Sequence, residues 1–369
     1  MADKYRVGII GRTGRGNYGH GLDTVWREID RAEVIAVADD DERGRWAARS
    51  RTGAERAYSD YHKMLEEEKL DIVAVAPRWI NEHRDMMVAA AEHGCHIYTE
   101  KPFCRDLTEA DAIVSACEMR HLKLAISHQT RWTPTLEVVK REIDNGLIGR
   151  VLEIRGRGKE DARRGGGEDL WVLGSHVLDL MRVFGGDPTT CHATVYANGE
   201  PVTRSHVHEG PEGIGPIAGD AINATYTLPD GVTGFFGSHR AAAGSPSRFG
   251  IQIFGTEGVI EFLTGHLPAC HVLQDSSWSP GRSGKKWVPI SSNGVGEAET
   301  LPRTGLHGGN VLAVNNLIDC IENPEQDPKC SMYDARWTVE MIAGVFESHR
   351  TGGPVTLPLK QRENPLTLL

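Results

Sequence analysis

Apolar residues in the first third of the chain follow two alternating patterns, short unbroken runs and longer segments with helical spacing. The unbroken runs predict buried strands over residues 5–10, 33–39, 71–77, 96–100 and 122–127. The segments between them predict helices over residues 23–31, 42–50, 82–93 and 107–119. Strands that are apolar on both faces and alternate with helices are typical of a parallel sheet covered on both sides. The fold class predicted for this part is α/β, with a doubly wound parallel sheet.

The pattern changes after residue 128, where a helix is predicted over 134–146. Short alternating strands then dominate residues 191–262, and helices are predicted over 310–321 and 334–349. Consecutive strands with short connections favour antiparallel pairing. We therefore predict one domain over 1–128 and, over 129–369, an α+β domain with a large open, mostly antiparallel sheet, whose last segment packs back on the first domain. Residues 274–304, rich in Ser, Gly and Pro, predict a long surface loop or lid.

An open sheet of this size leaves one face uncovered within a single chain. We expect this face to be large and hydrophobic, and such surfaces in soluble proteins usually mark an interface. A second copy of the chain is the expected cover, because most soluble oligomers are symmetric. The prediction is a homodimer or homotetramer that associates through the C-terminal sheet.

Composition and charge exclude several classes of partner. The 369 residues are 39% hydrophobic and 25% charged, as in a globular protein, and the formal net charge is −10. An acidic surface argues against nucleic acid and anionic membranes as partners, and no apolar run reaches the length of a bilayer span. The N-terminal residues lack a leader pattern, and the seven cysteines include no CxxC pair. We expect a cytoplasmic protein with reduced thiols. No cysteine or histidine spacing is diagnostic of a metal site, so we expect no metal.

Residues 8–21, GIIGRTGRGNYGHG, connect the first predicted strand to the first predicted helix. Glycine permits a tight turn and a close approach of the backbone to a pyrophosphate, and amides at a helix N-terminus supply a positive field. Gly14, Gly16 and Gly19 spell GxGxxG, whereas Gly11 with Gly14 and Gly16 places the turn at the end of the strand. We favour the second spacing, as in a Rossmann domain. The predicted dinucleotide-binding residues are Gly11, Arg12, Thr13, Gly14, Arg15 and Gly16.

An acidic residue at the end of the second predicted strand strengthens this prediction. Asp39 lies 23 positions after Gly16 (39 − 16), near the spacing of about 20 that is typical of a ribose-binding carboxylate. It would accept hydrogen bonds from both ribose hydroxyls and repel a 2′-phosphate. We therefore expect NAD as the cofactor and NADP as less favoured, although Arg12, Arg43 and Arg45 are close enough in sequence to soften the preference.

Lys101 stands between Glu100 and Pro102 at the end of the fourth predicted strand. Proline favours extended backbone in the residue before it, so Lys101 is held in one direction. Ligands of open α/β sheets bind beyond the carboxyl ends of the strands, which places Lys101 on the same edge as the glycine loop. A positive nicotinamide would favour the neutral amine of Lys101, which can then take the proton of a reacting hydroxyl. The alternative is a surface lysine paired with Glu100.

Several segments, in this order, resemble the glucose–fructose oxidoreductase/inositol dehydrogenase/MocA (Gfo/Idh/MocA) family over nearly the whole chain. They are the GxxGxG loop, Asp39, EKPF (100–103), LIGRVLEIRG (147–156) and SHRTGGPVTLPL (348–359). The resemblance implies a Rossmann domain, a second domain with an open sheet, and hydride transfer at a carbinol of a sugar or cyclitol. It also implies cofactor contacts by Pro77, His83, Glu100 and Lys101.

The resemblance identifies a candidate substrate site in GGGEDLWVLGSHVLDLMR, residues 165–182. His176 matches the family histidine that hydrogen-bonds the reacting hydroxyl, so Lys101 and His176 are the predicted catalytic residues. The family usually has an aspartate four residues earlier, where this chain has Val172. The alternative for His176 is a core histidine that caps the following helix. The predicted substrate contacts are Lys101, His128, Arg131, Asp169 and His176.

Three functions are compatible with these features. The favoured one is an NAD-dependent dehydrogenase acting on a CH–OH group of a sugar, glycoside or cyclitol. The second is a redox-neutral enzyme, such as an epimerase, lyase or glycosidase, that keeps its NAD and forms a keto-sugar transiently; Val172 and the predicted lid support it. The third is a non-catalytic NAD-binding regulator.

Overall fold

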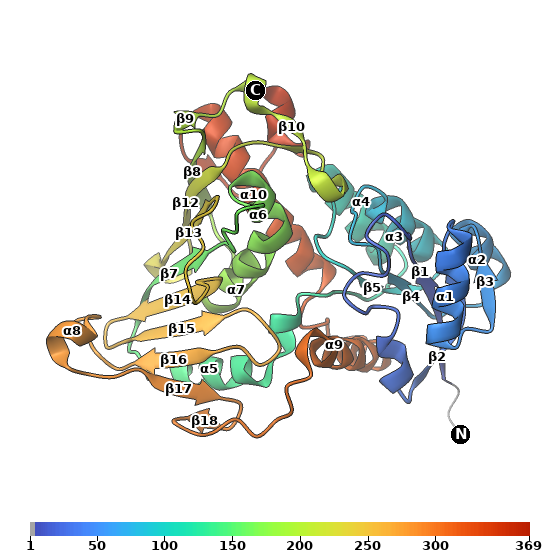
Figure 1. The fold of residues 1–369 in the computed structure, drawn as a ribbon, viewed down its shortest axis with the longest axis horizontal. Helices are drawn as coiled ribbons and strands as arrows, with labels where there is room; N and C mark the ends of the chain where they lie inside the picture. The colour runs from blue at the N-terminus through green and yellow to red at the C-terminus, as the bar shows by residue number, and fades with distance from the viewer. Residues whose placement is uncertain (1–3) are drawn as a thin grey trace. The chain divides into compact units, whose positions relative to one another are not determined.

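The computed structural model describes residues 4–369, which divide into two compact units (Figure 1). The first unit consists of Met1–Gln129, Pro211–Gly215 and Leu306–Arg336. The second unit consists of Thr130–Gly210, Pro216–Gly305 and Trp337–Leu369. The first boundary lies next to the predicted one. The later segments differ, because 306–336 joins the first unit while the end of the chain joins the second.

The first unit contains a six-stranded sheet of order β3-β2-β1-β4-β5-β6, in which all neighbouring strands are parallel. The predicted doubly wound α/β fold is thus confirmed. The order reverses between β1 and β4, and sheets of this kind bind ligands at that point, beyond the carboxyl ends of the strands. The strands are β1 (Tyr5–Ile10), β2 (Ala32–Ala38), β3 (Arg56–Tyr58), β4 (Ile72–Val75), β5 (His96–Thr99) and β6 (Leu124–Ile126).

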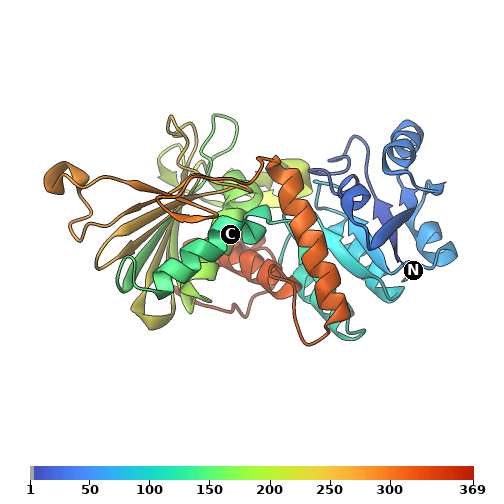
Figure 2. The ribbon, with the colours of Figure 1, turned by 90° about the horizontal axis from the view of Figure 1, so that it is seen from below.

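Helices pack against this parallel sheet from two distant parts of the sequence. Four of them connect its strands: α1 (Glu42–Thr52), α2 (Tyr61–Glu67), α3 (His83–Glu92) and α4 (Leu107–Glu118). A fifth, α9 (Gly305–Glu322), comes from far along the chain and lies beside the sheet, in orange in Figure 2. The first unit is therefore completed by a late segment of the sequence.

The connection between β1 and β2 contradicts the prediction of a helix over residues 23–31. A single 3₁₀ turn, η1 (Val25–Glu28), forms there instead. The indole Nε1 of Trp26 donates to the carbonyl of Leu22 at 2.9 Å, and an α-helix would need that carbonyl for the amide of residue 26. Leu22, Val25 and Trp26 are all buried. Their apolar spacing therefore arises because the connection packs into the core, although it does not form an α-helix.

The second unit contains an eleven-stranded sheet of order β18-β17-β16-β15-β14-β7-β13-β12-β8-β19, with β9 paired to β8. Neighbouring strands are antiparallel except β7 and β13, which are parallel, so the prediction of a mostly antiparallel sheet is confirmed. The strands are β7 (Val151–Arg157), β8 (Thr190–Ala197), β9 (Glu200–Pro201), β12 (Ala221–Thr227), β13 (Thr233–His239), β14 (Gly250–Gly255), β15 (Val259–Leu263), β16 (Cys270–Leu273), β17 (Val288–Ser291), β18 (Gly294–Val295) and β19 (Val355–Thr356).

Two helices pack closely on one face of the large sheet. Helix α7 (Ser175–Gly185) approaches β7, where a Cβ atom on Gly156 would stand 2.4 Å from a methyl group of Val177. Helix α10 (Met332–Thr351) covers the neighbouring strands, and the carbonyl of Met341 accepts a hydrogen bond from the Tyr226 hydroxyl at 3.0 Å. Alternate residues of each strand point to this face and form the core of the unit.

The opposite face of the sheet carries both apolar and polar side chains. Its centre is a hollow of about 520 Å³. The side chains that line it include Phe235, but most end in polar groups: Glu153, Arg155, Arg157, His192, Thr194, Asn223 and Thr225. That a second copy of the chain covers this face stays a prediction.

Residues 274–304 contain more regular secondary structure than the predicted loop. They contain β17, β18 and the short helix α8 (Pro280–Ser283), which extend one edge of the large sheet. All seven cysteines are buried free thiols. Within residues 4–369, no helix is both long and apolar enough to cross a membrane.

Candidate functional site

The glycine loop leaves the end of β1 and folds back on itself as a narrow turn. The amide of Arg12 donates to the carbonyl of Asn17 at 3.0 Å, and the amide of Asn17 donates back to Arg12 at 2.8 Å. Gly14 and Gly16 lie inside this turn with φ of 82° and 87°, which favour glycine. A Cβ atom on Gly16 would stand 2.4 Å from the backbone nitrogen of Arg78, so this position also needs glycine for space.

The turn itself offers the donors that a phosphate needs. No α-helix follows it directly in the described chain, so the predicted amides of a helix N-terminus are replaced by those of the loop. Within residues 4–369, the amides of Gly16, Tyr18 and His20 donate no hydrogen bond to the protein. Amides grouped around residues with positive φ form anion-binding concavities. A Cβ atom on Gly14 would meet nothing within 4 Å, which leaves room beside the turn. This donor set fits a pyrophosphate.

Asp39 lies just after β2 and organises the glycine loop. Its carboxylate accepts hydrogen bonds from the Thr13 hydroxyl at 2.7 Å, from the Thr13 amide at 3.1 Å and from the Asp41 amide at 3.0 Å. A carboxylate has about four acceptor positions, so these donors occupy most of them. The adjacent Asp40 side chain is 56% exposed and is the more accessible acceptor.

A pocket of about 460 Å³ opens beyond the carboxyl ends of the first three strands. Pockets of about 300–1,000 Å³ are typical of cofactor sites. The rings of Tyr61 and His62, at the start of α2, lie 4.2 Å apart at the wall of this pocket. Acidic side chains and an aromatic surface together suit the ribose and base of a nucleotide. The lining residues are Ile10, Gly11, Arg12, Ala38, Asp39, Asp40, Ser59, Asp60, Tyr61 and His62.

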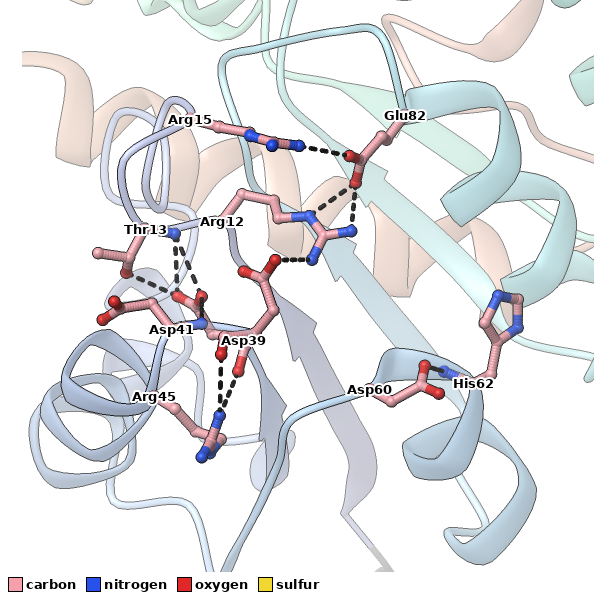
Figure 3. Close-up of polar contacts among 10 residues, drawn as sticks. Arg12, Thr13, Arg15, Asp39, Asp41, Arg45, Asp60, His62 and Glu82 are labelled. Carbon is pink, nitrogen blue, oxygen red and sulfur yellow. Dashed lines mark hydrogen bonds and ion pairs between the residues drawn. The ribbon is translucent and has the colours of Figure 1, made fainter.

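Two arginines of the glycine loop are bound by carboxylates from other loops (Figure 3). Arg12 Nη1 lies 2.8 Å from Asp40, and Arg12 Nη2 lies 2.5 Å from Glu82, which immediately precedes α3. Arg15 Nη1 lies 3.3 Å from the same Glu82 carboxylate. Burial alone would lower the pKa of Arg12, but the hydrogen bond and charge of Glu82 and the charge of Asp40 raise it. These ion pairs join the β1 loop to the β4 loop at the point where the strand order reverses.

Glu100 and Lys101 follow β5, and both are buried. The Glu100 carboxylate contacts the His20 ring and accepts hydrogen bonds from the Ser127 hydroxyl at 2.6 Å and the Lys101 amide at 2.8 Å. Burial would raise the pKa of Glu100, but the hydrogen bond and charge of His20, with Lys101 and Ser127, lower it to about 2. Glu100 thus stays ionised and ties the glycine loop, through His20, to the end of β5.

Two further histidines of the first unit have buried rings. His83 Nε2 lies 2.8 Å from the carbonyl of Pro77, and its Nδ1 lies 3.1 Å from the carbonyl of Phe103. Burial lowers the pKa of His83, and the hydrogen bonds to the two carbonyls act against that shift. His83 therefore links the loops after β4 and β5 rather than exposing its ring to a ligand. His128, after β6, is buried with Nδ1 3.7 Å from the thiol of Cys330.

Helix α9 supports the glycine loop from behind through one side chain. Asn310 is fully buried, and its Nδ2 donates to the carbonyl of His20 at 2.9 Å. Its Oδ1 accepts from the Tyr98 hydroxyl at 2.8 Å and from Gln129 Nε2 at 3.2 Å. One amide group therefore joins the glycine loop to β5 and to the segment after β6.

The second unit carries the other candidate catalytic residue. His176 is the second residue of α7, and its ring meets Phe249 edge-on at 6.4 Å. Asp179, one turn later on the same side of the helix, lies 3.6 Å from Arg131. Val172 is buried in a π-helical turn, η3 (Leu170–Gly174), just before α7. His176 and Arg131 are thus placed by the same turn of α7, whereas Lys101 belongs to the other unit.

The carboxylate of Asp169 is bound by other groups of the protein. It is fully buried, and its carboxylate accepts hydrogen bonds from the Ser238 hydroxyl at 2.6 Å and from the amides of Lys159 and Glu160 at 3.3 and 3.2 Å. Burial raises the pKa of Asp169, and these hydrogen bonds act against that rise. The geometry gives Asp169 the role of fastening the loop after β7, and its contact with substrate stays a prediction.

Sequence reasoning missed four residues of the nucleotide site. Asp40 and Tyr61 line the pocket, Glu82 holds both arginines, and Asn310 supports the loop. The triplet Asp39-Asp40-Asp41 and the polar cluster 59–62 after a short strand were available signals for the first two. The contacts of Glu82 and Asn310 join positions 70 and 290 residues apart, so no local pattern reveals them.

Comparison with known proteins gives consistent results in both halves of the chain. Residues 5–128 match the sequence model of an oxidoreductase family with an NAD-binding Rossmann fold. Residues 136–261 match that of the GFO/IDH/MocA C-terminal domain.

Individual relatives match over most of their length. D-apiose dehydrogenase of Paraburkholderia graminis is 28% identical over 354 residues, which cover 92% of this chain and 87% of the relative. The scyllo-inositol 2-dehydrogenase (NAD(+)) of Bacillus subtilis is 26% identical over 376 residues, which cover 98% of each chain. The structure of a levoglucosan dehydrogenase in complex with NADH and levoglucosan superimposes with a TM-score of 0.76 at 20% identity, covering 97% of this chain and 100% of that one, which shows the fold.

Proposed function

Because the chain belongs to the Gfo/Idh/MocA oxidoreductase family and carries its NAD-binding Rossmann domain, we propose that it is an NAD-dependent dehydrogenase of a sugar, glycoside or cyclitol. The observation that carries the proposal is the nucleotide site of the first unit. There, a turn with unpaired amides in the described chain meets a pocket lined by Asp39, Asp40 and Tyr61. The relatives named for D-apiose and scyllo-inositol dehydrogenation support a polyhydroxylated substrate.

In this mechanism NAD, when bound, supplies the hydride acceptor for the carbon that bears the reacting hydroxyl. Lys101 takes the hydroxyl proton and stabilises the negative charge that develops on oxygen. Its amide is fixed by the ionised Glu100, which keeps the end of β5 in place. His176 donates or accepts the second hydrogen bond to the same hydroxyl, and Arg131 binds a further oxygen of the substrate.

A redox-neutral reaction is the second candidate, and Val172 favours it. An apolar, buried residue replaces the aspartate that usually assists His176 in this family. The chain thus departs from the family arrangement expected for oxidation of a simple polyol, which supports an enzyme in which oxidation is transient and the ketone activates a neighbouring bond. Such an enzyme would keep its NAD through the cycle and release no NADH.

The test combines a binding experiment with a turnover experiment. NAD binding to the purified protein is measured by calorimetry. The protein is then mixed with NAD and D-apiose, levoglucosan, myo-inositol or scyllo-inositol, and reduced nicotinamide is followed by near-ultraviolet absorbance. The dehydrogenase predicts a rise with one class of substrate. Product formation without NADH would support the redox-neutral reaction, and NAD binding with no product of either kind would contradict both.

A further inference from the structure

We propose that Glu82 sets the preference of the nucleotide pocket for NAD over NADP by holding Arg12 in an ion pair. NADP differs from NAD by a phosphate on the 2′ oxygen of the adenosine ribose, so the preference depends on nearby carboxylates and on whether a cation is offered to that phosphate or withheld from it. The inference rests on the proposed dinucleotide function and assigns a specificity role to a residue outside the ribose-binding loop.

Arg12 is the cation placed to meet a 2′-phosphate. It lines the same pocket as Asp39 and Asp40, the two carboxylates beside which the ribose would lie. A guanidinium binds phosphate through two parallel N–H groups and remains charged at any working pH. A free Arg12 would therefore attract NADP.

The structure shows Arg12 occupied by two carboxylates instead. Its Nε and Nη2 lie 2.6 and 2.5 Å from Oε2 of Glu82, and its Nη1 lies 2.8 Å from Asp40. Arg15 also pairs with Glu82, so the two arginines and the two carboxylates balance in charge, and Arg12 offers a phosphate no unneutralised positive charge. Arg45 is also engaged, because its Nη1 donates to the carbonyl of Asp39 at 2.7 Å. Arg12 and Arg45 are therefore both engaged within the protein, and neither is offered to the 2′-phosphate of NADP.

The carboxylate of Glu82 pairs with the two arginines of the glycine loop and is not used to cap its own helix. Glu82 is the N-cap residue of α3, yet its side chain makes no capping hydrogen bond. Its position is fixed by the next residue, His83, whose ring is held between the carbonyls of Pro77 and Phe103. The carboxylate is thereby presented to the glycine loop from the β4 side.

A double-mutant cycle on Glu82 and Arg12 tests the proposal by binding alone. The full-length protein and the variants Glu82→Gln, Arg12→Gln and the double variant are titrated with NAD and with NADP, and thermal melts verify folding. Asp85→Asn is the matched control, because Asp85 is one turn along α3 and its carboxylate pairs with Arg84 at 2.6 Å rather than with Arg12.

We expect Glu82→Gln to lower the ratio of NADP to NAD dissociation constants roughly tenfold, mainly through tighter NADP binding, which corresponds to about 1.4 kcal/mol. Asp85→Asn should leave the ratio unchanged, and Glu82→Gln should have no effect in the Arg12→Gln background. An unchanged ratio in Glu82→Gln, or an equal change with and without Arg12, would overturn the inference while NAD binding itself stands. A wild-type protein that binds neither dinucleotide would overturn the proposed function and this inference together.

Discussion

Gly14 and Gly16 share a backbone conformation but differ in their surroundings, which makes them a matched pair for mutation. Both have positive φ, so alanine at either position costs about 1–2 kcal/mol of backbone strain. Only Gly16 of the two lies against the β4 loop, 2.4 Å from the Arg78 nitrogen once a Cβ is added. We expect Gly16→Ala to weaken NAD binding at least tenfold and Gly14→Ala to weaken it less, by calorimetry. Equal losses of NAD affinity in the two variants would show that the backbone φ, and not the contact with the β4 loop, determines the effect of each substitution.

Lys101 gives a second prediction at this scale. Methionine has a similar length but cannot accept or donate the hydroxyl proton, so Lys101→Met should reduce turnover by about 10²–10⁴-fold. NAD affinity should change far less than turnover, because the Lys101 side chain is not part of the lining of the pocket at Asp39 and Asp40. Steady-state kinetics and a binding titration on the same preparation measure both quantities. Full turnover in this variant would remove Lys101 from the mechanism.

Glu100 should make the stability of the protein depend on pH in a defined window. Its pKa falls from 4.5 to about 2 on folding, so the folded state binds this proton less readily than the unfolded state. The contribution is fully present above pH 4.5 and is lost as pH falls toward about 2; it is on the order of 3 kcal/mol. Urea unfolding across this window should show a shallower slope for Glu100→Gln than for the wild type. The exposed Glu66→Gln is the control and should retain the wild-type slope.

Sequence patterns could identify residues whose type is required by the local backbone or by their position next to a strand. Gly14 and Gly16 have a required φ, and Asp39 has a required position after a strand. Glu82 and Asn310 could not be found this way, because their roles depend on partners that only the folded chain brings near. Asp39 lines the pocket, but its engagement by Thr13 depends on the geometry of the turn and could not be predicted.

At the scale of elements, α9 is the support on which the glycine loop depends most directly. Asn310→Ala would leave the Tyr98 hydroxyl, the Gln129 amide and the His20 carbonyl without their common partner. Buried polar groups left in this way cost about 1–3 kcal/mol each, so we expect a loss of about 3 kcal/mol in the free energy of unfolding, together with weaker NAD binding.

Leu312→Ala on the same helix is the control for this experiment. Leu312 is 38% exposed, so its truncation should change stability by no more than about 0.5 kcal/mol. Chemical denaturation of both variants separates the two effects. If Leu312→Ala lowered the free energy of unfolding as much as Asn310→Ala, the stability of the helix, and not the buried amide of Asn310, would support the loop.

Among the elements themselves, burial on both faces made the central strands of the first unit predictable. β3 and α2 were missed because three and seven residues are too short to show a period. The apolar spacing at 23–31 was real, but the Trp26 indole takes the carbonyl that a helix would use. In residues 274–304, strands of two to four residues lie at the edge of the sheet, where glycine and serine conceal the alternation.

At the scale of the whole molecule, we predict association through the uncovered face of the large sheet. Arg155 stacks on Phe254 at 4.2 Å and pairs with Glu153 at 2.6 Å, so this face carries ordered aromatic and charged groups around its hollow. Light scattering should give twice or four times the chain mass of 40.5 kDa. Phe235→Asp should shift the protein toward the monomer.

A matched substitution in the first unit provides the control. Trp46, on α1 of the first unit, is 50% exposed, and Trp46→Asp introduces the same charge in place of an aromatic ring. It should leave the mass unchanged. A monomeric wild type, or identical behaviour of the two variants, would argue against the sheet as the interface.

The contact between Asn310 and His20 also sets an order of events during protein synthesis. The glycine loop leaves the ribosome before the amide that supports it, which comes 290 residues later. After residue 129, the end of the first segment of the unit, 181 further residues (310 − 129) must be translated before Asn310 exists. At about 5–20 residues per second this takes about 10–40 s. Throughout that interval the nascent chain lacks the amide that supports the glycine loop, so NAD loading is expected only after Asn310 has been translated.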